Sequence, residues 1–224
     1  MPAAWVCASV RVKAARRFVE TGAVKMPIVL RSSKPPRITA LARQPNRKEA
    51  MNELEPHYSG LSPEEIPPIP RNPVHVVLDN IRSAFNVGSI FRTSDAGAVE
   101  RIHLCGMTAH PPHKKLEKTA LGAFDYVPWA YAERTTDVLR GLGESGVARI
   151  AVEVTGDAVP FQEFDWPRPV AIVFGNEVAG INDRVLGHCD GVVQIPMMGH
   201  KNSLNVATAF GVVLYDVLRR WSSI

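Results

Sequence analysis

Short, nearly unbroken apolar runs recur along the chain from residue 74 onward. The clearest are VHVVLD at 74–79, ARIAVEV at 148–154 and VAIVFG at 170–175, and two weaker ones are RIHLCG at 101–106 and VVQIP at 192–196. Runs of this length that are rich in Val and Ile predict strands. Because both faces of these strands are apolar, the pattern favours a parallel sheet that is covered on both sides.

Segments with helical spacing alternate with these strands. They cover residues 86–98, 113–121, 135–142 and 203–220. Alternating strands and helices predict an α/β domain, with a mainly parallel sheet and helices on both of its faces. The segment 203–220 is nearly all apolar, so we expect a long helix that buries almost every face.

A proline-rich stretch precedes the first strand. It contains SSKPPR and SPEEIPPIPRN within residues 31–72, and repeated proline opposes both helix and central strand. We therefore divide the chain into a basic, Pro-rich extension and linker over residues 1–72 and a folded domain over residues 73–224. No run of about 18 apolar residues is free of charge, so we expect no membrane-spanning helix.

The formal net charge of +4 hides an asymmetry. Residues 1–48 carry eleven Lys or Arg and one acid, Glu20, for a net +10, whereas the remainder carries 15 basic and 21 acidic residues, for a net −6. A basic arm attracts polyanions through phosphate contacts and counterion release. Three other interpretations stay open: a solvated extension with no specific role, an Arg-rich transit peptide, and an over-long start, since Met26 and Met51 could each begin the chain.

The cysteine and histidine pattern excludes several classes of site. Cys7, Cys105 and Cys189 are widely spaced, which argues against a disulfide framework and for a reducing compartment. We therefore expect a cytoplasmic protein, or an organellar one if residues 1–48 are a transit peptide. The ligand-type residues within 103–113 match no standard zinc spacing, so we expect no metal.

Common nucleotide-binding and hydrolase motifs are also missing. The stretch GLGESG at 141–146 matches the dinucleotide-binding letters, but it follows a predicted helix and precedes a predicted strand, which is the wrong order for that site. No GxSxG, HExxH or GxxxxGK[ST] is present. The commoner hydrolase and NTPase interpretations are therefore excluded.

Two segments contain polar residues that the packing of a hydrophobic core does not require. In DNIRSAFNVGSIFRTSDAGA (79–98), Asn86 opens a helix, Gly88 allows a ligand or another backbone to approach closely, and Arg92 follows less than two turns later. In VFGNEVAGI (173–181), a buried strand ends at Gly175 and Glu177 follows it. Ligands of parallel α/β sheets bind beyond the carboxyl ends of strands, so both segments are candidates for a site.

A third segment, IPMMGHKNSLN at 195–205, joins the last strand to the last helix. Asn202 or Ser203 is suited to capping that helix. Asn205 then falls in the first turn of an otherwise apolar helix, where a buried amide needs a hydrogen-bond partner. We expect it either to cap the helix or to contact a ligand or a neighbouring loop.

Together the three segments resemble, in order, the signature motifs of the SpoU (TrmH-like) RNA ribose methyltransferases of the SPOUT superfamily. The matching patterns are N-x-G-x-x-x-R-T-x-D-A, F-G-N-E-x-x-G and I-P-M-x-G-x-x-x-S-L-N-V, and they span about Val74 to Arg220. The resemblance implies a C-terminal trefoil knot, a homodimer and S-adenosylmethionine as cofactor. The implied cofactor contacts are Gly175, Ile195, Met197, Ser203 and Leu204, with Val152 or Glu153 as weaker candidates.

The resemblance also implies the reaction, which is methyl transfer to a ribose 2′-hydroxyl of tRNA or rRNA. Arg92 matches the catalytic arginine of the family, and Asn86, Glu177 and Asn205 match residues that build the site. An arginine is almost never neutral in proteins, so a guanidinium that binds phosphate and orients the hydroxyl is easier to justify than a base. Two alternatives stay open: a knotted enzyme that methylates an RNA base, and a non-catalytic module that binds RNA or the cofactor.

Overall fold

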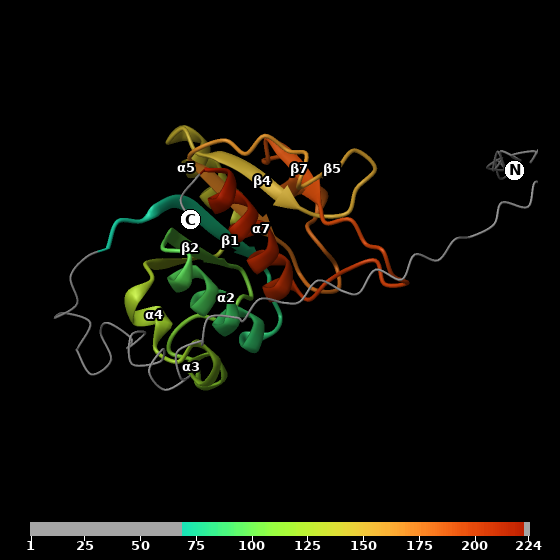
Figure 1. The fold of residues 1–224 in the computed structure, drawn as a ribbon. Coiled ribbons are helices and arrows are strands. Elements are labelled where there is room, and N and C mark those ends of the chain that lie inside the picture. Colours follow the sequence, from blue (N-terminus) through green and yellow to red (C-terminus); the bar gives the residue numbers. More distant parts are fainter. Residues whose placement is uncertain (1–68, 222–224) are drawn as a thin grey trace, which may run out of the picture. The chain divides into compact units, whose positions relative to one another are not determined.

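Every pairing between named strands is parallel in residues 69–221, the part of the chain that the computed structural model describes. The seven strands lie in the order β3-β2-β1-β6-β4-β7-β5, and Figure 1 shows β1 beside β2, with β4, β7 and β5 farther along the sheet. The parallel sheet expected from the apolar runs is therefore confirmed. The strands are β1 (Asn72–Asp79), β2 (Val99–Cys105), β3 (Trp129–Ala132), β4 (Ala148–Val152), β5 (Val159–Pro160), β6 (Val170–Phe174) and β7 (Gly191–Gln194).

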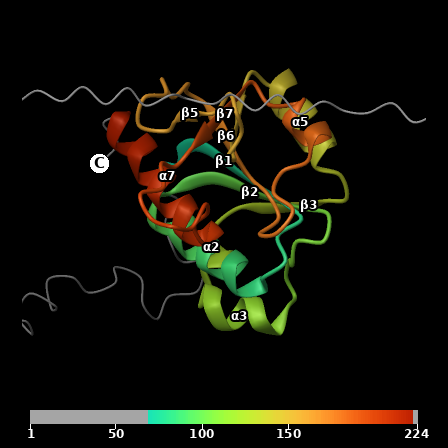
Figure 2. The same ribbon diagram turned by 90° about the vertical axis from the view of Figure 1, so that its right-hand side faces the viewer.

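Helices cover both faces of this sheet, as the alternation of elements predicts. Successive side chains of β1 point to opposite faces: Val76 and Leu78 belong to a core with α2, α3 and α7, and Val77 belongs to a second core with α5 and α6. Figure 2 shows α2, α3 and α7 on one side of the sheet and α5 on the other. The helices are α2 (Ala84–Ala96), α3 (Lys114–Ala120), α4 (Ala123–Tyr126), α5 (Thr135–Glu144), α6 (Asp183–Leu186) and α7 (Val206–Arg220).

The last helix differs from its prediction in two ways. It begins at Val206 rather than Ser203, and its N-cap is Asn205. It also buries only one face, because a helix that packs on a sheet hides a single stripe. The side chains of Val212 and Tyr215 are 40% and 42% exposed, so the expectation that almost every face is buried was wrong.

Gly88 shows why α2 can pack closely against α3. A Cβ atom at this position would lie 2.5 Å from Oγ1 of Thr119 and 2.9 Å from the backbone nitrogen of Ala120. Of the two uses foreseen for this glycine, a ligand or another backbone, the structure therefore selects the backbone of α3.

Several expectations are not decided by the fold. The extension over residues 1–72 lies outside the described residues except for its last four, and the boundary at residue 72 and the trefoil knot stay predictions. Among residues 69–221, no helix is long and apolar enough to cross a membrane. The same residues contain no group of three or more His, Cys, Asp or Glu side chains that could hold a metal ion.

Candidate active site at the carboxyl edge of the sheet

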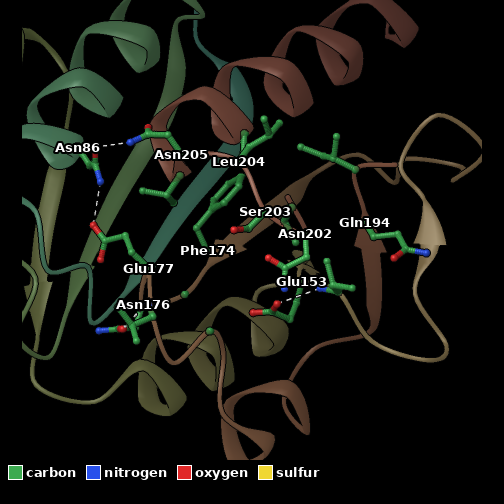
Figure 3. Close-up of a pocket in the computed structure, with 18 of the residues that line it drawn as sticks. Asn86, Glu153, Phe174, Asn176, Glu177, Gln194, Asn202, Ser203, Leu204 and Asn205 are labelled. Atoms are coloured by element: carbon green, nitrogen blue, oxygen red, sulfur yellow. Dashed lines mark hydrogen bonds between the residues drawn. The ribbon is translucent and has the colours of Figure 1, made fainter. Parts of the chain in front are cut away.

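A cavity of about 1130 Å³ opens beyond the carboxyl ends of β4, β6 and β7. Its walls are the segments that follow β4 and β6, the loop 195–205 that follows β7, and the start of α2 (Figure 3). This is where parallel α/β sheets bind ligands. Eight of the nine residues assigned to the site from sequence line it: Asn86, Gly175, Glu177, Ile195, Met197, Ser203, Leu204 and Asn205. The two weaker candidates, Val152 and Glu153, line it as well.

Three polar side chains from distant segments form one hydrogen-bonded chain at the rim of this cleft. The Asn205 side-chain amide donates to Oδ1 of Asn86 at 3.0 Å, and the Asn86 amide donates to Oε1 of Glu177 at 2.9 Å. Asn205 also accepts the backbone N–H groups of Ala207 and Thr208, so it caps α7 through its oxygen while its nitrogen reaches α2. The capping role foreseen for this residue is confirmed, and its amide contacts helix α2 rather than a loop.

Glu177 is the acceptor on which this chain of hydrogen bonds ends. Its two carboxylate oxygens accept the backbone N–H groups of Arg82 at 2.8 Å and Ser83 at 3.1 Å, in addition to the amide of Asn86. Partial burial acts to raise the pKa of Glu177, but these donors outweigh it and lower the pKa below its ordinary value. The residue is therefore a carboxylate at neutral pH that fixes the start of α2.

The turn after β6 is shaped by glycine and by an asparagine side chain. A Cβ atom on Gly175 would lie 2.5 Å from Cγ1 of Ile181 and 2.6 Å from the carbonyl carbon of Gly180, so only glycine fits there. Oδ1 of Asn176 accepts the N–H groups of Val178 and Ala179 at 3.0 Å. A β-bridge between Asn176 and Gly180 also folds the turn back on itself at the edge of the cleft.

The donors and charges of the cleft suit a cationic sulfonium nucleoside. Two carboxylates, Glu153 and Glu177, line the cavity against one cation, Arg82, whereas S-adenosylmethionine carries a net positive charge through its sulfonium and ammonium groups. Glu153 is held by the backbone N–H groups of Val154 and Ile181 at 2.9 Å. Apolar side chains from Phe174, Ile195 and Leu204 provide walls for a purine ring.

Arg92 is the one predicted site residue that does not line the cleft. It is exposed on α2, six residues or about 9 Å along the helix axis from Asn86. At 100° per residue it also points about 120° away from Asn86 around the helix. Among the described residues it forms no ion pair. A single copy of the chain therefore leaves this guanidinium outside its own cleft.

The sequence missed other residues that line the cleft. Asn176 ties the turn after β6 to β1, because its amide donates to the carbonyl of Asn80 at 2.9 Å. Its position directly after Gly175, in a turn already considered part of a site, could have identified it from the sequence. Arg82 and Gln194 gave no such signal, because each resembles an ordinary surface residue in its own segment, and Asn202 was expected only as a helix cap.

Comparisons with known proteins identify the family of this chain. The SpoU rRNA Methylase family model matches residues 73–215. The tRNA (guanosine(18)-2′-O)-methyltransferase of Thermus thermophilus is 32% identical over 145 residues, which are 65% of this chain and 74% of that protein. The chain therefore belongs to the SpoU rRNA methylase family, as its motifs indicated.

Two solved structures share the fold. The S-adenosylmethionine-bound rRNA methyltransferase from Sinorhizobium meliloti has 30% identity and a TM-score of 0.62, over 70% of this chain and 59% of that chain. The SpoU methyltransferase AviRb from Streptomyces viridochromogenes, in complex with the same cofactor, has 27% identity and a TM-score of 0.63, over 70% of this chain and 60% of that one. This chain thus spans about three fifths of each of these two chains.

Proposed function

We propose that the chain transfers a methyl group from S-adenosylmethionine to the 2′-hydroxyl of a ribose in tRNA or rRNA. The observation that carries this proposal is the joining of Asn86, Glu177 and Asn205, one from each family motif, into a single hydrogen-bonded chain at the cleft. The Thermus relative is named for ribose methylation of a tRNA guanosine, which supports the reaction class.

The residues of the cleft act mainly by positioning. When bound, the cofactor supplies a methyl sulfonium that is already activated. Glu177 is a poor general base, because its lowered pKa and its three hydrogen-bond donors leave little tendency to take a proton. Its role is to hold the start of α2 and the Asn86 amide in place at the cleft.

Arg92 is proposed to bind an RNA phosphate and to orient the ribose hydroxyl. A guanidinium stays protonated, so it stabilises the negative charge that develops on the oxygen rather than removing the proton. Because Arg92 does not line the cleft of its own chain, we propose that it contributes to the active site of a second copy of the chain.

A homodimer is proposed through the outer surface of α2 and α7. The two helices pack side by side, with Gly211 facing Thr93. Val212 and Tyr215 are exposed apolar residues of α7, and Arg92 is an exposed residue of α2. A second copy that covers this surface would bury apolar area and carry Arg92 into the interface.

The reaction is tested by incubating the full-length protein with labelled S-adenosylmethionine and pools of unmodified tRNA and rRNA transcripts. Nucleoside analysis should reveal a 2′-O-methylated nucleoside that is lost in Arg92→Ala. A base-methylated product would instead favour the knotted base methyltransferases, and cofactor or RNA binding without any product would favour a binding module.

We also propose a cytoplasmic location, supported by the free thiols of Cys105 and Cys189.

A further inference from the structure

A second pocket, of about 540 Å³, adjoins the cleft. It lies between the start of α2, the loop that follows β2 and the start of α3. Arg82 and Ser83 line both cavities, and Glu177 holds the backbone N–H groups of both residues. The partition between the two cavities is therefore a fixed piece of backbone. The pocket is lined by Arg82, Ser83, Ala84, Phe85, Gly106, Met107, Thr108, Ala109, His110, Pro112, His113 and Lys115.

The polar lining of this pocket favours an anion. Arg82 and Lys115 supply two cations, and no Asp or Glu lines the pocket. Within residues 69–221, neither cation forms an ion pair. This contrasts with the adjoining cleft, which two carboxylates line. A phosphate is the anion that Lys and Arg bind most readily in an RNA substrate.

The same pocket also presents flat and apolar surfaces to water. Phe85 is 49% exposed and Met107 is 63% exposed, and the ring of His110 packs on Tyr131 with centroids 4.5 Å apart. Exposed aromatic side chains of this kind stack on unpaired RNA bases.

From these contacts we propose that the pocket holds the base and phosphate of the target nucleotide of the RNA. The ribose would then lie at the partition formed by Arg82 and Ser83, with its 2′-hydroxyl turned toward the cleft. The nucleotide must be unpaired, because a base inside a duplex cannot enter a pocket of this kind. This assignment rests on the proposed ribose methylation and adds the site at which the substrate is recognised.

Two substitutions test the assignment in the full-length protein. Phe85→Ala should raise the KM for RNA by about tenfold or more, because it removes a stacking surface, and Phe85→Tyr should retain the wild-type KM. Lys115→Ala should lower the slope of log affinity against log salt by about one, as expected for one lost phosphate contact. Leu121→Ala and Lys118→Ala alter an exposed apolar and an exposed basic residue of the same region outside the pocket, and both should behave as wild type.

The measurements separate this assignment from the proposed function. The affinity for S-adenosylmethionine, measured by calorimetry, should be unchanged in Phe85→Ala and Lys115→Ala. Photo-crosslinking of 4-thiouridine-substituted tRNA and rRNA transcripts should label peptides that contain Phe85 or Met107. If methyl transfer occurs but both variants keep the wild-type KM and the crosslinks map elsewhere, the pocket assignment is wrong and the reaction stands. If no RNA is methylated but the crosslinks map to the pocket, the proposed reaction fails and the RNA site is retained.

Discussion

The side-chain amide of Asn205 donates a 3.0 Å hydrogen bond to Asn86, which lies 119 residues earlier in the chain. This contact joins the N-cap of α7 to the first turn of α2. The Asn86 amide in turn donates a hydrogen bond to Glu177, which follows β6. Three strand-to-helix connections are thereby fixed relative to one another at the mouth of the cleft. The same amide has a structural and a positioning role, and substitutions can separate the two.

Asn205→Asp should separate capping from positioning. An aspartate keeps the acceptor for the N–H groups of Ala207 and Thr208, but it cannot donate to Asn86. We expect thermal stability close to wild type and a loss of about tenfold or more in kcat/KM, the usual effect of a lost polar contact in a site. Asn205→Ala should lose the same activity and also about 1 kcal/mol of stability.

A remote cap serves as the control for that comparison. Asn182 caps α6 by accepting the N–H of Val185 at 3.0 Å, and it does not line the cleft. Asn182→Ala should therefore lower the melting temperature and leave kcat/KM unchanged. If Asn205→Asp has wild-type activity, the contact with Asn86 has no part in catalysis.

Two glycine substitutions should have opposite effects on stability. Gly175→Ala places a methyl group 2.6 Å from the backbone of Gly180, so we expect a loss of about 1–3 kcal/mol and weaker binding of S-adenosylmethionine. Gly141 lies in α5, and a Cβ atom there meets nothing within 4 Å. Gly141→Ala should stabilise the protein by up to about 1 kcal/mol. Denaturant unfolding and calorimetry measure both effects; equal stabilities would contradict the close approach at Gly175.

The sequence predicted the long elements of the fold because their cause is local. The runs at β1, β4 and β6 are apolar on both faces, and burial on both faces is the property that defines a central parallel strand. The short strands β3 and β5 and the single turns α4 and α6 were missed, since two to four residues carry no periodicity.

The start of α7 and the position of Arg92 depend on tertiary contacts, and this limits their prediction. Asn202 and Ser203 are good caps by residue type, yet Asn205 caps the helix, and Asn202 and Ser203 lie in the preceding loop and line the cleft. Arg92 was correctly placed on a helix, but helical spacing alone does not reveal that Asn86 faces the cleft while Arg92 faces outward. The motifs gave the residues of the site, and only the structure shows which of them touch.

Acid should destabilise the wild-type protein more than Glu177→Gln. The pKa of Glu177 is lowered in the folded state from an ordinary value of about 4.5, so its stabilising effect is present above the unfolded pKa and is lost as pH falls through the folded one. The difference in melting temperature between the two proteins should be constant above about pH 5 and shrink below about pH 4. Asp190 and Asp216, whose pKa values are also lowered, titrate in both proteins and cancel in the difference. If the melting temperatures of the two proteins differ by the same amount at every pH from 3 to 7, the hydrogen bonds to Glu177 do not depend on its charge.

Mixing two inactive variants should restore activity if Arg92 serves the cleft of a second copy. Arg92→Ala leaves the cleft intact, whereas Ser203→Trp fills it and leaves Arg92 in place, since Ser203 is an exposed residue of the cleft lining. In an equal mixture, half of the dimers are hybrid and each hybrid has one complete site, so we expect about one quarter of wild-type activity. Each variant mixed with wild type sets the reference, and light scattering confirms that dimers form. If the mixture of the two variants stays inactive although hybrid dimers are present, Arg92 acts within its own subunit and α2 must move when RNA binds.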